Sequence, residues 1–141
     1  MGGIVKIRDY VESDYTGVRL NLEDGGLFDP DWDSQDRLKA KIVRNPGSIL
    51  VAVVNDLWAV GNAFIVEDGW GAFIFRVVVR KTHRNLGIGS LLVSEAETRV
   101  KAKGYGDTSI FVEDDNPELK RWLERLGYVP ANSYRCMNKS I

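Results

Sequence analysis

The sequence is poor in the side chains that build disulfides and metal sites. It contains one cysteine, Cys136, and one histidine, His83. A single cysteine cannot form an internal disulfide, and these two side chains are too few for the ligand set of a zinc site. We therefore expect no metal ion, and the low cysteine content fits the reducing cytoplasm.

Long apolar runs are missing as well. No stretch approaches the roughly 20 apolar residues that are needed to span a bilayer. The segment from Met1 to Arg8 lacks the apolar core of a secretory signal and passes straight into alternating apolar and charged residues. We expect no membrane partner, and the 141 residues fit a single domain spanning 1–141.

A large excess of one charge is also absent, since the net charge is -1, but the charges are unevenly distributed. Acidic residues gather between positions 9 and 36, and a basic run lies between positions 76 and 84. The basic run is short, has no interleaved aromatic residues and is followed by glycines, so we expect no nucleic-acid partner. Charge runs of this kind are usually solvated, and we expect both to form solvated surface.

The spacing of apolar residues predicts a mixed α/β sheet. A first strand ends near Asp9 and is followed by two helices, the first capped by Ser13 or Asp14 and the second by Ser34. Three further apolar runs are joined by short turns, which is typical of an antiparallel meander. These runs cover residues 49–54, 57–66 and 72–79.

The period then changes to that of an amphipathic helix, which ends at Gly104. Its apolar residues recur every four positions at Ile88, Leu92, Ala96 and Val100. A strand over residues 110–112 follows, and then a helix that opens at Asn116-Pro117 and ends at Gly127. With a last strand from Tyr128 to Met137, the expected order is β-α-α-β-β-β-α-β-α-β.

The most informative segment is Arg84-Asn85-Leu86-Gly87-Ile88-Gly89, where a valine-rich strand leads into the first turn of a helix. Backbone N–H groups in a first turn have no partner within the helix, and the helix dipole is positive there, so an anion is stabilised. Gly87 and Gly89 lack Cβ atoms, which lets a phosphate approach the backbone, and Arg84 adds a charge-assisted contact. The segment therefore predicts a pyrophosphate-binding turn.

Two other phosphate-binding loops fit this segment less well. A Walker loop needs Gly-Lys followed by Ser or Thr, whereas Gly89 is followed by Ser90-Leu91. A dinucleotide-binding fingerprint needs a third glycine where Leu92 stands, and it needs an acidic residue at a spacing that Glu113 does not satisfy.

The remaining pattern, Arg-x-x-Gly-x-Gly after a valine-rich strand, resembles the coenzyme A-binding segment of the GCN5-related N-acetyltransferase (GNAT) family. The stretch from Asn116 to Tyr128 looks like a later segment of that family, in which an Asn opens a helix that ends in Leu-Gly-aromatic. The resemblance covers roughly residues 48 to 130. It implies a mixed, mostly antiparallel central sheet whose fourth and fifth strands are parallel and splay apart.

The resemblance implies an N-acetyltransferase that transfers the acetyl group of acetyl-CoA to a primary amine by direct attack. The amine would belong to a small molecule or a peptide, and family members often form homodimers. The pantetheine arm of acetyl-CoA would lie between the strands 73–79 and 108–112. The residues that this implies for the acyl donor are Val77, Val78, Val79, Arg84, Asn85, Leu86, Gly87, Ile88, Gly89, Ser90 and Asn116.

The resemblance does not supply a general acid or a general base. Leu123 and Phe73 stand where many family members carry a tyrosine acid and some a glutamate base. Glu113 and Tyr134 remain as candidates, although a strand-end glutamate is usually solvated and a sheet tyrosine is usually buried. We expect Cys136 to be a small buried hydrophobic residue. An alternative function is therefore a weakly catalytic acyl-CoA-binding sensor or regulatory module.

The acceptor side of family members is usually built by the first two helices and the loop between them. In this sequence that part is the acidic region from Glu23 to Asp36. Carboxylates beside aromatic rings suit a cationic amine, through Coulomb attraction and cation–π contact. The residues expected to contact the acceptor are Phe28, Asp29, Asp31 and Trp32.

Overall fold

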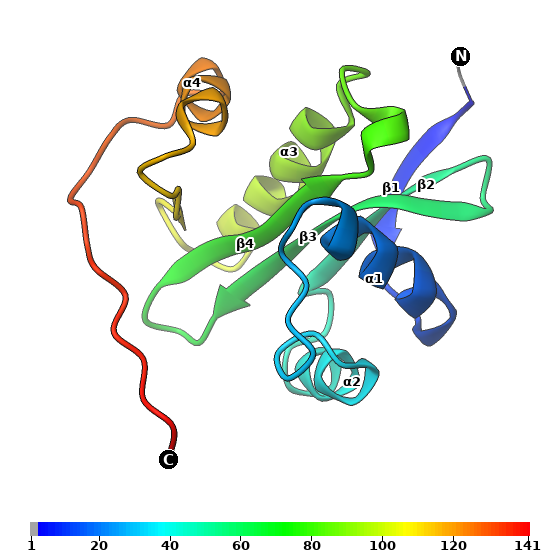
Figure 1. Ribbon diagram of the computed structural model, residues 1–141, viewed down its shortest axis with the longest axis horizontal. Helices are drawn as coiled ribbons and strands as arrows, with labels where there is room; N and C mark the ends of the chain where they lie inside the picture. Colours follow the sequence, from blue (N-terminus) through cyan, green and yellow to red (C-terminus); the bar gives the residue numbers. More distant parts are fainter. Residues whose placement is uncertain (1–2) are drawn as a thin grey trace. The chain divides into compact units, whose positions relative to one another are not determined.

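The computed structural model describes residues 3–141, which separate into one compact unit ending at Phe111 and a second beginning at Val112 (Figure 1). The first unit contains a five-stranded sheet in the order β1-β2-β3-β4-β5. Neighbouring strands are antiparallel except β4 and β5, which are parallel, so the expected mixed sheet with a parallel fourth and fifth strand is confirmed. The strands are β1 (Val5–Asp9), β2 (Ile49–Val54), β3 (Trp58–Glu67), β4 (Ala72–Val79) and β5 (Ser109–Ile110).

Helices cover both faces of this sheet, as Figure 1 shows. The helices α1 (Tyr15–Asp24) and α2 (Gln35–Arg44) lie on one face, and α3 (Ile88–Ala102) lies on the other. No helix within residues 3–141 has the length and apolar character that crossing a membrane requires.

Strand β2 shows how the apolar pattern builds the two cores. Ile49 and Val51 pack in the cluster that includes α1 and α2, whereas Leu50 and Ala52 pack in the cluster that includes α3. All four side chains are fully buried. A strand that is covered on both faces reads as an unbroken apolar run, which is why residues 49–54 show no alternation.

The predicted turns and caps are mostly confirmed. Asn55 and Asp56, between β2 and β3, have positive φ values of 54° and 59°, as a tight hairpin turn requires. Ser34 caps α2 by accepting a hydrogen bond from Arg37 N at 3.2 Å. The predicted N-cap of α1 is confirmed in its position but not in its side-chain hydrogen bond. Asp14 occupies the cap position, but its carboxylate instead accepts bonds from the Arg8 guanidinium and from Val11 N.

Strand β4 contains a β-bulge at Arg76 and Val77. The pairs Asn62–Val78 and Phe64–Phe75 flank it, so two residues of β4 face the single residue Ala63 of β3. Arg76 has a φ of 55°, a left-handed conformation that is costly for a residue with a Cβ atom. A bulge of this kind bends its strand and increases the local twist.

The second unit contains the helix α4 (Pro117–Arg125), which the sequence predicts correctly. The strand predicted from Tyr128 to Met137 is wrong, because this segment has no regular structure. An alternating pattern identifies residues that suit a strand, but the strand forms only where a neighbour accepts its backbone hydrogen bonds. The expected burial of Tyr134 and Cys136 is wrong for the same reason, since both are exposed.

Candidate functional site

The loop between β4 and α3 has a backbone shape that side chains with a Cβ atom rarely adopt. After the short helix η2 (Lys81–His83), Asn85 and Gly87 have positive φ values of 63° and 81°. Gly87 is the N-cap residue of α3, and a Cβ atom at this position would meet no atom within 4 Å. The space in front of the α3 N-terminus is therefore open on the side of Gly87.

The backbone amides at the end of this loop and in the first turn of α3 are free. Within residues 3–141, no hydrogen bond is donated by the amides from Asn85 to Ser90, and the first one of the helix runs from Leu91 N to Gly87 O at 3.1 Å. Left-handed and right-handed residues alternate at Gly87 and Ile88, an arrangement that turns successive N–H groups toward one point. These amides and the positive end of the α3 dipole make an anion-binding turn.

Side-chain bonds hold both ends of the loop. Lys81 N donates to the Asp24 carboxylate at 2.6 Å, which ties the start of the loop to the end of α1. Arg84 Nε donates to the Val79 carbonyl at 2.7 Å, so the guanidinium group lies at the end of β4. His83 is half-buried, and its Nδ1 lies 2.8 Å from Thr82 Oγ1.

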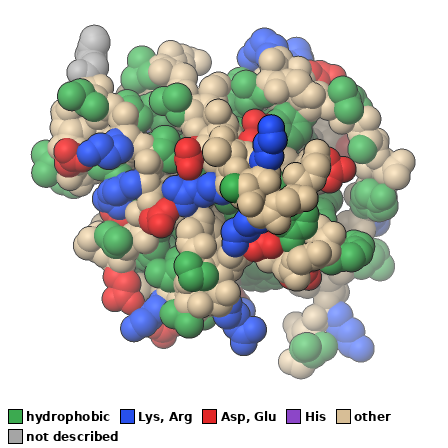
Figure 2. Space-filling model, turned by 180° about the vertical axis from the view of Figure 1, so that it is seen from behind, with side chains coloured by type: hydrophobic (Ala, Val, Ile, Leu, Met, Phe, Trp, Pro, Cys, Tyr) green, Lys and Arg blue, Asp and Glu red, His purple; other side chains and the backbone are tan. Residues whose placement is uncertain are grey.

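The expected solvation of the basic run is wrong for two of its arginines. Arg80 points inward, where its Nε donates to Asn21 Oδ1 at 2.9 Å and its Nη2 donates to the carbonyls of Gly17 and Ala59 at 3.1 and 3.0 Å. Arg76 is also directed inward, as described next. The expectation holds for Lys81 and Arg84, which are exposed. Figure 2 shows cationic and anionic side chains interspersed, with no large patch of one sign on the face in view.

The expected solvation of the acidic run is wrong for Asp33. This carboxylate is 2% exposed and accepts two hydrogen bonds from Arg76, from Nε at 3.1 Å and from Nη2 at 3.0 Å. The Arg76 carbonyl accepts a bond from Asn62 Nδ2 at 2.9 Å, and Asn62 Oδ1 accepts one from Asn21 Nδ2 at 3.1 Å. Asn21 and Asn62 are fully buried. None of these pairings is visible in the sequence, because the partners lie far apart along the chain.

Three phenylalanine rings gather where β4 and β5 last pair. The parallel pairs are Phe73–Ser109 and Ile74–Ile110, and no pair follows them within the described residues. The Phe111 ring stacks on Phe73 and on Phe75, with centroids 5.8 and 5.5 Å apart. Phe73, the residue at the expected base position, therefore belongs to an apolar cluster and has no proton to exchange.

The residues expected at the acceptor lie in the loop between α1 and α2. The Arg19 guanidinium is 4.6 Å from the centre of the Phe28 ring. Asp29 Oδ1 accepts bonds from the amides of Asp31 and Trp32 at 2.8 and 3.1 Å, which fixes the loop in a tight turn. Asp31 is exposed, and Trp32 is 73% exposed. The loop thus presents a carboxylate and an indole ring to solvent.

The second unit holds the other predicted residues. Asn116 is the N-cap of α4, where its side-chain oxygen accepts a bond from Leu119 N at 3.1 Å. Glu113 is exposed, and Tyr134 accepts a bond from Asn132 Nδ2 at 3.2 Å. Leu123 is buried. The described contacts give Asn116 a structural role, and its contact with the acyl donor stays a prediction.

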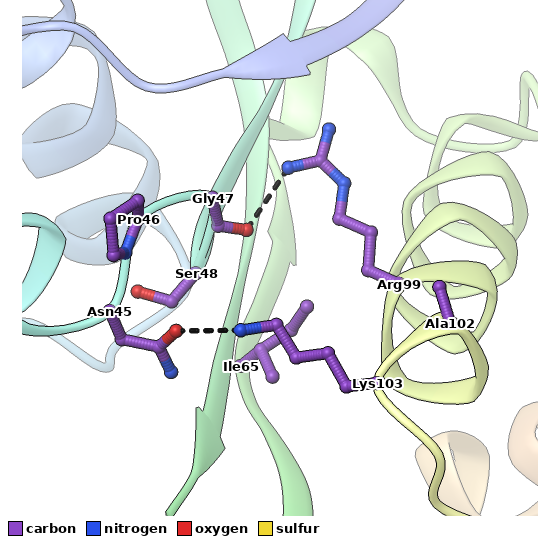
Figure 3. Close-up of a pocket in the computed structure, with 8 residues that line it drawn as sticks. All are labelled: Asn45, Pro46, Gly47, Ser48, Ile65, Arg99, Ala102 and Lys103. Carbon is purple, nitrogen blue, oxygen red and sulfur yellow. Dashed lines mark hydrogen bonds between the residues drawn. The ribbon is translucent and has the colours of Figure 1, made fainter.

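A hollow of about 200 Å³ lies at the opposite end of α3 from the loop, lined by Asn45, Pro46, Gly47, Ser48, Ile65, Arg99, Ala102 and Lys103 (Figure 3). Arg99 and Lys103 extend from α3 across it and bond Gly47 O and Asn45 Oδ1 at 3.0 and 3.1 Å. These bonds connect α3 with the segment after α2. The hollow is therefore a surface depression whose two sides are joined by side-chain hydrogen bonds.

A half-buried lysine lies near this hollow. Lys41 donates its ammonium group to the Ile65 carbonyl. Burial lowers the pKa of Lys41 to about 8, against the opposing attraction of Glu67. Hydrogen bonds from Tyr105 and then Lys103 lower the pKa of Glu67. These groups belong to the α2–β3 region and not to the loop before α3.

Comparison with known proteins shows which family the chain is similar to. A family model described as the acetyltransferase (GNAT) family matches residues 7–128. A Yersinia pestis (strain Pestoides F) acetyltransferase is 28% identical over 124 residues, which are 88% of this chain and 87% of the relative. An acetyltransferase of Sodalis glossinidius is 26% identical over 137 residues, which are 97% and 96% of the two chains.

Two solved structures are similar in fold. The PaiA N-acetyltransferase of Thermoplasma acidophilum, in complex with coenzyme A, has a TM-score of 0.81 at 18% identity and covers 93% of both chains. The aminoglycoside N-acetyltransferase AAC(6')-Iy, in complex with CoA, has a TM-score of 0.77 at 14% identity, covering 100% of this chain and 98% of the other. At these identities the likeness concerns the fold.

Proposed function

The chain belongs to the GNAT acetyltransferase family, and from this premise we propose that it transfers the acetyl group of acetyl-CoA to the primary amine of a cationic acceptor by direct attack. It is an acetyl-CoA-dependent N-acetyltransferase. The proposal concerns the residues that bind the donor, the chemistry of the acceptor and the way the two meet.

The single observation that carries the donor site is the row of free amides from Asn85 to Ser90. A pyrophosphate needs several donors that converge on one point and a positive potential, and the α3 N-terminus offers both. The open space at Gly87 admits the bulk of the phosphates. Arg84 is exposed and stands beside this turn, which supports its role in binding the diphosphate.

The free edge of β4 suits the pantetheine arm. The parallel pairing with β5 ends at Ile74, so within residues 3–141 the stretch from Val77 to Val79 has β3 alone as a paired neighbour. An extended polar chain binds such an edge through backbone hydrogen bonds, like an added strand. The arm would then run from the α3 N-terminus along Val79 and Val77 toward the rings of Phe75 and Phe111, where the strands last pair.

The chemistry requires few side chains. The amine nitrogen forms a bond to the thioester carbonyl carbon, the carbon–sulfur bond breaks, and coenzyme A leaves as a thiolate that takes a proton from solvent. The amine loses its proton to water. The protein supplies proximity of the two reactants and backbone N–H groups for the oxyanion. Loss of a dedicated proton donor, as at Leu123, slows such a reaction by about 10²- to 10⁴-fold.

The loop between α1 and α2 indicates that the acceptor is a cation. Asp31 and Trp32 are exposed there, next to Asp29, and a carboxylate beside an aromatic face attracts an ammonium group. The charge of Asp33 is compensated by Arg76, so it does not contribute to this attraction. An acceptor with several amines fits best, because one ammonium group is held by the loop while another, in its neutral form, attacks the thioester.

Titration calorimetry and thiol release test the proposal together. Acetyl-CoA should bind with 1:1 stoichiometry, and coenzyme A should be released faster when a polyamine such as spermidine or an aminoglycoside is added than with a neutral monoamine. Binding without turnover on a wide panel of amines would support the sensor alternative. No heat of binding with acetyl-CoA would overturn the donor site itself.

A further inference from the structure

The ion pair of Asp33 and Arg76 joins two parts of the first unit that the reaction would use. Arg76 is the bulge residue of β4, and Asp33 is the second-last residue before α2. The pair is bidentate, and the two side chains are 24% and 2% exposed for Arg76 and Asp33. A charge pair in this position has a high desolvation cost, so its geometry must be well satisfied for it to persist.

Asp33 also organises the loop in which it lies. Its Oδ2 accepts a bond from Asp29 N at 2.9 Å, and its amide donates to Asp29 O at 2.8 Å. Its carbonyl accepts a bond from the Tyr15 hydroxyl at 2.8 Å. The position of Asp33 therefore sets the position of Asp29, whose carboxylate in turn holds the turn at Asp31 and Trp32.

Arg76 is held at both its side chain and its backbone. Its left-handed conformation is strained for a residue with a Cβ atom, and the surrounding structure has to offset this strain. Asp33 fixes the guanidinium group, and Asn62 fixes the carbonyl oxygen. Asn62 is held by Asn21, and Asn21 by Arg80. A chain of buried and partly buried hydrogen bonds thus runs from the α1–α2 loop through the bulge to the residue that follows β4.

We propose that Asp33 and Arg76 are positioning residues that keep the bulge, and with it the backbone edge at Val77, in the conformation that receives the pantetheine arm. This inference rests on the proposed function. The pair does not touch the free amides after Arg84, where the diphosphate would bind. Its effect is therefore confined to the arm of the donor and to the acceptor loop that Asp33 organises.

This division gives the inference a measurable signature. Acetyl-CoA engages both the amides and the β4 edge, whereas adenosine 3',5'-bisphosphate has no pantetheine arm. Loss of the ion pair should weaken the binding of acetyl-CoA and leave the binding of adenosine 3',5'-bisphosphate unchanged. A merely structural role, acting through general loosening of the fold, would weaken both ligands alike.

The chain offers a matched control pair. Arg8 and Asp14 also form a bidentate ion pair, at 2.7 and 3.0 Å, with a nearly buried carboxylate and a partly exposed arginine. They join β1 to the start of α1, and β1 is at the edge of the sheet opposite β5. Asp14→Asn thus removes the same kind of interaction without altering the bulge.

The experiment measures the dissociation constants of both ligands by calorimetry for the wild type and for Asp33→Asn, Arg76→Lys and Asp14→Asn. We expect Asp33→Asn to weaken acetyl-CoA about 10-fold and to leave adenosine 3',5'-bisphosphate unchanged, since a small misplacement of a binding group has this effect. Arg76→Lys keeps the positive charge but loses the bidentate hydrogen bonding. It should therefore weaken the binding of acetyl-CoA by less than Asp33→Asn does. Asp14→Asn should change neither constant.

Equal weakening of both ligands in Asp33→Asn, or no change in either, overturns the inference. So does an Asp14→Asn variant with the same selective loss. If Asp33→Asn fails to fold, the Asp33→Asn/Arg76→Gln double variant, which leaves no unpaired charge, gives the same comparison. These results overturn the inference alone as long as the wild type binds acetyl-CoA. A wild type that binds neither ligand overturns the proposed function as well.

Discussion

The Nε atom of Arg84 donates a hydrogen bond to the carbonyl oxygen of Val79 at 2.7 Å. This bond fastens the first residue of the glycine loop to the last residue of β4, five positions earlier. It orients the guanidinium group at the strand end, and the remaining N–H groups of the guanidinium have no partner among residues 3–141, so they can meet an anion. One arginine thus shapes the loop and adds positive charge to it.

Replacement of Arg84 should weaken the binding of acetyl-CoA. We expect Arg84→Ala to raise the dissociation constant of acetyl-CoA about 10- to 100-fold, because a hydrogen bond to a charged group contributes about 1.5–3 kcal/mol. Calorimetry at two salt concentrations measures this effect and its electrostatic part. Arg44→Ala, which removes an exposed arginine from α2, is the control and should bind like the wild type. Unchanged affinity in Arg84→Ala would contradict a role for Arg84 in the donor site.

Replacement of Gly87 separates the cost to the fold from the cost to binding. Gly87→Ala forces a Cβ atom into a left-handed conformation and should lower the free energy of unfolding by about 1 kcal/mol. It should also weaken acetyl-CoA, because the methyl group occupies the open space before the helix. Gly104→Ala is matched, since Gly104 also has a positive φ and no atom within 4 Å of the added Cβ. It should lose similar stability but bind acetyl-CoA normally, and equal binding by both variants would exclude the turn as the phosphate site.

Neutralising the loop carboxylates, the half-buried Asp29 and the exposed Asp31, should affect the binding of the acceptor and not that of acetyl-CoA. We expect the double variant Asp29→Asn/Asp31→Asn to raise the KM of a cationic amine about 2- to 5-fold at low salt, the usual scale for exposed charges. The difference should shrink as salt rises. Asp107→Asn, which removes an exposed carboxylate outside the region of α1 and α2, serves as control. A KM that does not respond in the double variant would remove the loop from the acceptor site.

The stability of the protein should rise in mildly alkaline solution because of Lys41. Its pKa is lowered to about 8 in the folded chain, from an ordinary value of 10.5 when unfolded. Between these two values the unfolded chain binds a proton that the folded chain does not, so the free energy of unfolding increases with pH. Below about pH 8 this contribution is lost. Denaturant unfolding from pH 7 to 10 measures the increase.

Lys41→Met should abolish that increase, whereas Lys39→Met, which removes an exposed lysine from the same helix, should keep it. The same slope in Lys41→Met and the wild type would show that other groups cause the pH dependence.

The sequence predicts those features that depend on neighbours in the chain. The loop from Arg84 to Gly89 is recognisable because free amides, missing Cβ atoms and a nearby arginine all follow from consecutive residues. The order of helices and strands up to α4 follows from local periodicity. The meander follows from short turns such as Asn55-Asp56, whose left-handed conformation is typical of these two residues.

The inward-facing polar residues could not be predicted in this way. Asp33 lies in a run of acids that looks solvated, and its partner Arg76 is 43 residues away. Asn21 and Asn62 are separated by 41 residues, and nothing in the helix pattern marks Asn21 as buried. The wrong prediction of a strand from Tyr128 to Met137 has the same cause, because a strand forms only where a segment remote in the sequence pairs with it. A lone arginine between the apolar residues of β4 was the available signal for Arg76.

Because β2 is buried between two cores, its amide protons should exchange by a different route from those of the loop before α3. Its residues from Ile49 to Val53 are at most 1% exposed, and it is hydrogen-bonded to β1 on one side and β3 on the other. Amide protons in such a strand exchange with deuterium only through global unfolding, while those of the loop before α3 exchange through local fluctuations. The turn that would receive the diphosphate can therefore open locally while the centre of the sheet stays folded.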